Sequence, residues 1–98
     1  MSEPARVKPT VPLSRQQLRC AGMLADGLSM REIGVVLDVE WYTVRYHVET
    51  AAKKIPGGAW PPSVKLALWW RGASLALLEE APGARLRRQL LITRLSKA

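Results

Sequence analysis

A chain of 98 residues forms one small domain, and we expect no separate sensor or catalytic domain beside it. With 48% hydrophobic residues it can bury a core, and it has neither a bilayer-spanning apolar run nor a signal peptide, so we expect a cytoplasmic protein without membrane contact. The net charge of +7 fits a polyanionic partner such as nucleic acid, although small basic proteins also use such charge for solubility or for ribosomal or membrane contacts.

The first twelve residues contain three prolines, which prevent a helix and favour extended backbone. Arg6 and Lys8 make this segment basic. We therefore predict a flexible basic arm over residues 1–12, which either frays as a terminus or reaches the backbone of bound DNA.

Two helices are predicted next. Ser14 is a good N-cap for a helix that runs to about Asp26, where Gly27 can adopt the left-handed conformation that ends a helix. Its inner face comprises Leu13, Cys20, Ala21 and Leu24. The second helix begins at Ser29, which has Glu32 three residues later in a capping-box pattern, and it ends near Leu37.

Gly34 lies inside the second helix, where glycine costs about 1 kcal/mol relative to alanine. A close helix–helix crossing that admits no larger side chain would justify this cost. Such a crossing is what a helix-turn-helix requires.

A turn over 38–40, with Val39 pointing inward, leads to a long helix over 40–55, which Pro56 and two glycines end. At about 100° per residue, one third of its circumference is apolar and predicts the buried face. That face comprises Val44, Val48, Ala51, Ala52 and Ile55. The remaining side carries two aromatic residues, two cations and one acid: Tyr42, Arg45, Tyr46, Glu49 and Lys53. These residue types are suited to contact a DNA groove.

Further helical segments follow over 63–71, 75–81 and 84–96, separated by glycine and proline. The last segment is apolar on all sides, which predicts burial between two surfaces, one of them another subunit. The basic residues of the C-terminal run, which contains no acid, form either a solvated face or a second phosphate-binding surface; they are Arg85, Arg87, Arg88, Arg94 and Lys97.

The order and spacing of several motifs resemble the LuxR-type (LuxR/NarL) DNA-binding domain of bacterial transcription regulators. The motifs are Leu13-Ser14, Ala25-x-Gly27-Leu28-Ser29, Glu32-Ile33 with Leu37, Thr43-Val44-x-x-His47-Val48 and Lys54-Ile55, followed by Ala67 and Gly72. The resemblance implies an all-α fold: a four-helix LuxR-type helix-turn-helix domain over residues 13–75. An extra C-terminal helical extension over 76–98 is then a candidate dimerisation element.

Four positions depart from the family pattern. Gln17 stands where the family has Glu, and Gly34 stands where it has Ala. Asp38 replaces the usual turn Gly, and Glu40 replaces the Ser or Thr that caps the recognition helix. Glu40 can accept an N–H bond less ideally, and its charge suits the helix dipole.

The resemblance implies that helix 40–55 enters the major groove, with Arg45, Tyr46 and Glu49 facing bases. Arg45 can pair bidentately with guanine, Glu49 can accept from cytosine N4, and Tyr46 suits an apolar or sugar contact. Contacts to the DNA backbone are expected from Ser29, Arg31, Tyr42, Thr43 and Lys53, and these should supply most of the affinity.

The fourth helix forms the dimer interface in the family. Trp69 and Trp70 are adjacent and cannot share one helix face, so one should lie in the core and the other is left for solvent or a partner. Leu86 and Leu90 of the last helix complete the predicted interface of a homodimer.

The sequence offers no nucleophile motif and no phosphate-cradling glycine loop, so we predict no catalytic residue and no cofactor. His47 is the single histidine and Cys20 the single cysteine, so neither a metal site nor a disulfide is expected; both are read as packing residues, with a phosphate contact open to His47. The predicted function is a sequence-specific regulator of transcription, a repressor or autorepressor of bacterial or phage origin. The alternative is a protein-interaction module that binds another regulator or RNA polymerase, with weak DNA contact.

Overall fold

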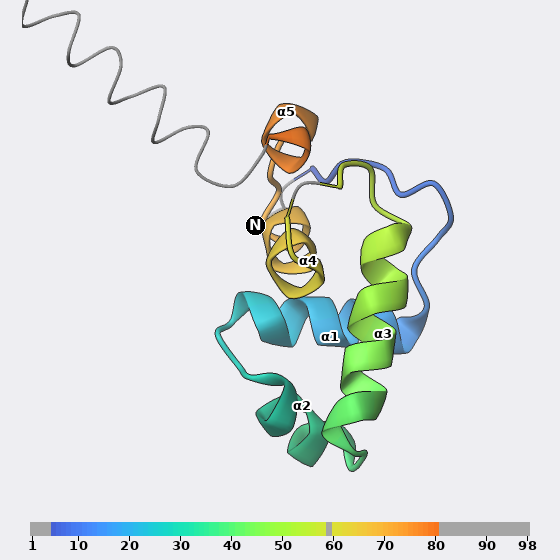
Figure 1. Ribbon diagram of the computed structural model, residues 1–98, viewed down its shortest axis with the longest axis vertical. Helices are drawn as coiled ribbons and strands as arrows, with labels where there is room; N and C mark the ends of the chain where they lie inside the picture. Colours follow the sequence, from blue (N-terminus) through green and yellow to red (C-terminus); the bar gives the residue numbers. More distant parts are fainter. Residues whose placement is uncertain (1–4, 59, 81–98) are drawn as a thin grey trace, which may run out of the picture.

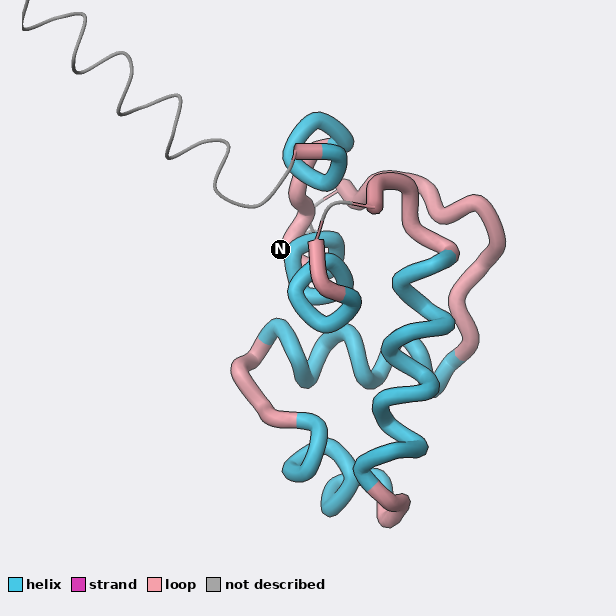
Figure 2. Tube along the Cα trace, viewed as in Figure 1, coloured by secondary structure: helices cyan, strands magenta, loops and turns pink. Residues whose placement is uncertain are grey.

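The computed structural model describes residues 5–58 and 60–80. These residues form five helices and no strand (Figures 1 and 2). The helices are α1 (Arg15–Ala25), α2 (Met30–Leu37), α3 (Trp41–Lys53), α4 (Pro62–Trp70) and α5 (Leu75–Glu79). The predicted all-α fold is confirmed, and each predicted helix within the described residues begins and ends within two residues of its expected bounds.

Local capping explains where the first two helices begin. Ser14 accepts from the backbone N–H of Gln17, and the Gln17 side chain accepts from the backbone N–H of Ser14, which is a complete capping box. Ser29 and Glu32 make the same reciprocal pair at the start of α2, as the sequence predicted. Gln17 therefore fulfils the capping role of the glutamate that the pattern normally has there.

The helices pack around α3, the longest of them (Figure 1). α2 packs against α3 across a tight turn at one end of the molecule, α1 crosses behind α3, and α4 packs on α1 and α3 near the other end. α5 contacts α4 alone among the helices. The α2–turn–α3 unit is thus supported from one side, and the exposed side of α3 is left uncovered by helices.

One hydrophobic core joins α1, α2, α3, α4 and α5. All five residues of the predicted apolar face of α3 are buried, together with Ile33 of α2. The other large members are Cys20, Leu66, Trp69 and Leu78. Leu13, Leu24, Leu37 and Val39 are only partly buried and lie at the edge of this core. The helical periodicity therefore predicted the buried face of α3 correctly.

The close approach predicted at Gly34 is present, but the turn makes it rather than a crossing helix. A Cβ on Gly34 would lie 2.7 Å from the carbonyl oxygen of Val39 and 3.5 Å from the backbone nitrogen of Trp41. The chain doubles back over Gly34, because Val39 N–H donates to the Gly34 carbonyl at 2.9 Å. A short turn therefore needs glycine here.

The segment 5–12 lies on the domain, although its prolines and basic residues predict a flexible arm. Arg6 Nε donates to the Trp70 carbonyl at 2.7 Å, and the Arg6 guanidinium lies 4.1 Å from the centre of a Trp70 ring. Trp69 Nε1 donates to the Val7 carbonyl at 2.7 Å, and Thr10 N–H donates to the Lys54 carbonyl at 2.7 Å. Prolines keep this segment extended, and its polar groups find partners on α4 and at the end of α3.

Helix α5, which follows α4, is bonded to the indole of Trp60 in the loop before α4. Trp60 Nε1 donates to the Leu77 carbonyl at 2.8 Å, so the loop before α4 holds α5 in place. The helix predicted over 84–96, with Leu86 and Leu90, lies outside the described residues.

Candidate nucleic-acid interface

Helix α3 presents a continuous exposed side opposite its buried valines. Tyr42 is 59% exposed and Tyr46 is 65% exposed. Arg45 and Lys53 are exposed as well, and Glu49 is partly exposed. Each of Tyr42, Arg45, Tyr46 and Glu49 lies three or four positions from two of the others, so the four lie along neighbouring turns of one side of the helix. The structure brings the three predicted base-reading residues together.

Arg45 and Glu49 are bonded to one another. Arg45 Nε donates to Glu49 Oε1 at 2.8 Å, and their side chains are 57% and 42% exposed. This hydrogen bond and the attraction of the carboxylate raise the pKa of Arg45 further above its usual value. Arg45 is therefore a permanent cation with a defined orientation.

Three of the predicted backbone-contacting residues, Arg31, Tyr42 and Thr43, lie in the first turns of α2 and α3. Arg31 is exposed, and its guanidinium lies 5.4 Å from a ring centre of Trp41. Tyr42 packs edge-on against Trp41 at 6.1 Å between ring centroids. Thr43 is partly buried in the next position of the same helix. Trp41 itself is 37% exposed and lies against Arg31 and Tyr42.

Ser29 and Lys53 occupy the two ends of this surface. Ser29 is exposed at the N-terminus of α2, where its hydroxyl is already engaged by the backbone N–H of Glu32 at 3.1 Å. The first backbone N–H groups of α2 remain the polar feature that can meet a phosphate there. Lys53 is exposed in the last turn of α3.

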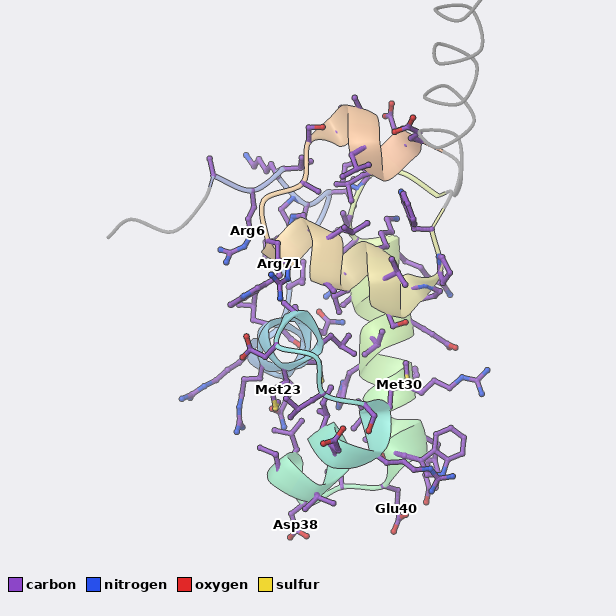
Figure 3. All side chains as sticks on the ribbon, turned by 90° about the vertical axis from the view of Figure 1, so that its left-hand side faces the viewer. Arg6, Met23, Met30, Asp38, Glu40 and Arg71 are labelled. Atoms are coloured by element: carbon purple, nitrogen blue, oxygen red, sulfur yellow. The ribbon has the colours of Figure 1, made fainter. Side chains whose placement is uncertain are left out.

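The N-terminus of α3 is acidic and has no side-chain cap. Glu40 is the N-cap residue, with φ −68° and ψ 150°, and its side chain makes no capping hydrogen bond. Asp38 stands in the left-handed conformation, with φ 57° and ψ 47°. Figure 3 shows both carboxylates pointing away from the domain at its lower end. The capping bond considered for Glu40 is absent because its longer side chain extends into solvent.

The C-terminus of α3 is held by groups that the sequence reading missed. Lys65 of α4 is buried, and its ammonium donates to the carbonyls of Ala52, at 2.8 Å, and of Gly57. Burial lowers the pKa of the Lys65 ammonium. A single cation in the apolar stretch Val64–Trp70 was the available signal, because a lysine on an apolar helix face needs acceptors.

A second missed group joins α1 to α3. Gln17 is 5% exposed, and its Nε2 donates to Thr50 Oγ1 at 3.0 Å. Its Oε1 accepts from Lys54 Nζ at 2.7 Å, in addition to the capping bond from Ser14 N–H at 2.8 Å. The amide can both donate and accept, which a carboxylate at this position cannot do.

The two tryptophans of α4 are both engaged within the chain. Trp69 is 4% exposed and belongs to the core, as predicted for one of the pair. Trp70 is partly buried: the Arg6 guanidinium lies over it, and a Cβ on Gly22 of α1 would lie 3.2 Å from its Cζ2. Trp70, the ring predicted to contact solvent or a partner, is therefore largely covered by residues of the same chain.

Cys20 and His47, the single cysteine and the single histidine, are packed against other residues of the domain. Cys20 is fully buried, and burial raises the pKa of its thiol. His47 is partly buried and lies 6.1 Å from Tyr46, measured between ring centroids. Over residues 5–58 and 60–80, no group of three or more His, Cys, Asp or Glu side chains could hold a metal ion. No helix in those ranges is long and apolar enough to cross a membrane.

Residues 11–56 match the family model described as bacterial regulatory proteins, luxR family. The match begins just before α1 and ends just after α3, so it covers the helix-turn-helix and its supporting helix. No curated protein and no solved structure gave a match.

Proposed function

We propose, on the premise that residues 11–56 are a LuxR-type helix-turn-helix domain, that this chain binds double-stranded DNA sequence-specifically and regulates transcription. The observation that carries the proposal is the exposed face of α3, where Arg45, Tyr46 and Glu49 lie side by side. An α-helix fits the major groove, and residues on one such face reach successive base edges. The chain then acts by binding rather than by catalysis.

In this arrangement Arg45 and Tyr46 face bases, and Glu49 lies beside them on the same face of α3. The DNA backbone is contacted by Ser29, Arg31, Tyr42, Thr43 and Lys53, which flank the same face. We further propose that the chain forms a symmetric homodimer, with α4 and the C-terminal extension in its interface. We also propose that it acts as a repressor in the bacterial cytoplasm, encoded either by a bacterium or by a phage. Because Trp69 and Trp70 are covered by residues of the same chain, we propose that exposed positions of α4, such as Val64 at 41% exposure, contribute more to that interface.

Selection of bound sequences from a random duplex pool tests the proposal. We expect one enriched motif, and Arg45→Ala should cost about 1–3 kcal/mol on that motif and relax its sequence preference. Equal loss on the motif and on random duplex would contradict base reading by Arg45. Failure to enrich any motif would refute sequence-specific binding.

A salt titration tests the backbone contacts. Lys53→Ala should weaken binding to all sequences and reduce the slope of log K against log salt by about 1. An unchanged slope would remove Lys53 from the backbone contacts. Sedimentation of the full chain tests the dimer, and a monomer at assay concentrations would exclude it.

A second candidate function, protein interaction, is favoured by the charge of the matched segment. Residues 11–56 carry six basic residues, Arg15, Arg19, Arg31, Arg45, Lys53 and Lys54, against five acidic ones, Asp26, Glu32, Asp38, Glu40 and Glu49. The net charge of +7 therefore resides mostly outside the helix-turn-helix.

Exposed apolar residues on α2 also favour protein interaction. Val35 is 83% exposed and Val36 is 57% exposed, and neither lies among the predicted DNA contacts. A module that binds another regulator or RNA polymerase would show only weak, salt-sensitive DNA binding. A gel shift on the chain's own upstream DNA, with unrelated duplex as competitor, separates the two candidates.

A further inference from the structure

The bond between Arg45 and Glu49 lies within the predicted reading face itself. Arg45 Nε donates to Glu49 Oε1 at 2.8 Å, four residues apart on α3. Both residues were expected to contact bases independently, one a guanine and the other a cytosine. In the structure the carboxylate of Glu49 is already occupied by its neighbour.

Helix stability does not explain this pairing. Both side chains are largely exposed, and an exposed ion pair contributes little to the stability of a fold. The basic residue lies N-terminal to the acidic one, which is the less favourable order relative to the helix dipole.

Lys53 makes the choice of partner informative. It lies four residues after Glu49, in the order that the helix dipole favours, yet the ion pair present is the one with Arg45. Lys53 remains exposed in the last turn of α3. The pairing thus leaves Lys53 for a phosphate and directs the acid to Arg45.

The atoms used in the bond decide what Arg45 can do. A guanidinium has five N–H donors in one plane, and the bond to Glu49 uses the single donor on Nε. The four donors on the two Nη atoms lie at the end of the side chain, where a bidentate partner is met. A carboxylate bound at Nε restrains the rotation of the plane and lowers the entropy lost when the Nη atoms bind.

We propose that Glu49 is a positioning residue for Arg45 and not a base reader: its carboxylate holds Nε so that the two Nη nitrogens meet O6 and N7 of one guanine. This inference rests on the proposed DNA-binding function. The chain then specifies a single G·C pair through Arg45 and Glu49 together. When another base takes that place, the oriented guanidinium faces a poor acceptor, and discrimination rises.

Parallel selections from a random duplex pool test the inference. Wild type and Arg45→Ala identify the position read by Arg45, where the preference for guanine should fall by about 5- to 150-fold. Glu49→Ala should lower the preference at that same position and leave the others unchanged. Glu49→Gln should retain most of it, because its amide oxygen can still accept from Nε.

Glu40→Gln is the matched control, since it removes an exposed acid at the start of the same helix. It should raise affinity for all sequences by a similar factor and leave the motif unchanged, because Glu40 makes no capping bond. If Glu49→Ala also acts equally on all sequences, its effect is only that of charge and the positioning role is refuted. If it alters a different position from Arg45→Ala, Glu49 reads a base itself, which also overturns the inference.

A measurement without DNA separates this inference from the proposed function. In the free protein, the Nε–H resonance of Arg45 should be protected from exchange with water, and Glu49→Ala should remove that protection. Loss of protection together with an enriched wild-type motif supports the positioning role. Protection with no enriched motif would leave the ion pair in place but refute DNA reading, and the inference with it.

Discussion

The two ends of α3 are built differently. At its C-terminus, Lys65 donates to the Ala52 and Gly57 carbonyls, and Thr10 donates to the Lys54 carbonyl. At its N-terminus, Glu40 caps nothing with its side chain, and Asp38 stands in a left-handed conformation. Both acids point away from the domain (Figure 3). The helix is anchored at one end and exposed at the other, as suits its proposed entry into a DNA groove.

This contrast teaches that fold stability and recognition are separated along one helix. Substitutions near residues 52–57 should act on the stability of the whole domain. Substitutions near residues 38–41 should act weakly on stability and mainly on what the helix contacts. The following predictions test this division, from the largest expected effect to the smallest.

Gly57→Ala should be the most damaging change at the anchored end. Gly57 has φ +96°, and a Cβ there would lie 2.7 Å from the carbonyl carbon of Leu78, in addition to contact with its oxygen. We expect a loss of about 2–4 kcal/mol in the free energy of unfolding, from backbone strain together with overpacking. Denaturant titration measures it, and Gly58→Ala is the control, because a Cβ at Gly58 would meet nothing within 4 Å.

Lys65→Met should remove the link between α4 and the end of α3. The apolar replacement leaves two backbone carbonyls without their ammonium donor, which should destabilise the domain by about 1–3 kcal/mol. Thermal unfolding of this variant is compared with that of Lys53→Met, which alters an exposed lysine and should change stability by no more than about 0.5 kcal/mol. Equal losses in the two variants would contradict the anchoring role.

Asp38→Gly should stabilise the exposed end slightly. Asp38 holds φ 57°, which glycine adopts without a Cβ penalty, so we expect a gain of about 0.5–1 kcal/mol. Asp26→Gly serves as the comparison, because Asp26 ends α1 with φ −82° and offers no strain to relieve. A gain in both variants would point to loss of negative charge rather than to relief of backbone strain.

The pH dependence of α2 should be the smallest effect. The backbone N–H of Ser29, followed by its hydroxyl, lowers the pKa of Glu32. Because the folded pKa lies below the unfolded one, the stabilisation is present above the ordinary glutamate pKa of about 4.3 and is lost as pH falls through the folded value.

Glu32→Gln isolates this contribution, because it keeps an acceptor for the Ser29 N–H and removes the titrating group. Melting temperatures of the two proteins should differ most near neutral pH and converge below pH 4 or so, in the window set by the lowered pKa. A difference that stays constant across this range would assign the effect of Glu32 to packing alone.

The sequence determined the helices and their orientation, because the interactions responsible act over three or four residues. Ser29 with Glu32 predicted the start of α2, and the spacing of Val44, Val48 and Ile55 predicted which side of α3 is buried. The order of these local signals also predicted the similarity to the luxR family that residues 11–56 show.

Tertiary structure alone decided how α3 is held and what its reading face presents. Lys65 and Ala52 are thirteen residues apart, Gln17 and Lys54 are thirty-seven apart, and Arg6 and Trp70 are sixty-four apart. No periodicity connects such residues, because their contacts depend on how helices cross. The choice of Arg45 over Lys53 as the partner of Glu49 has a related cause: both lie at the same spacing, and only the side-chain conformations on the folded surface distinguish them.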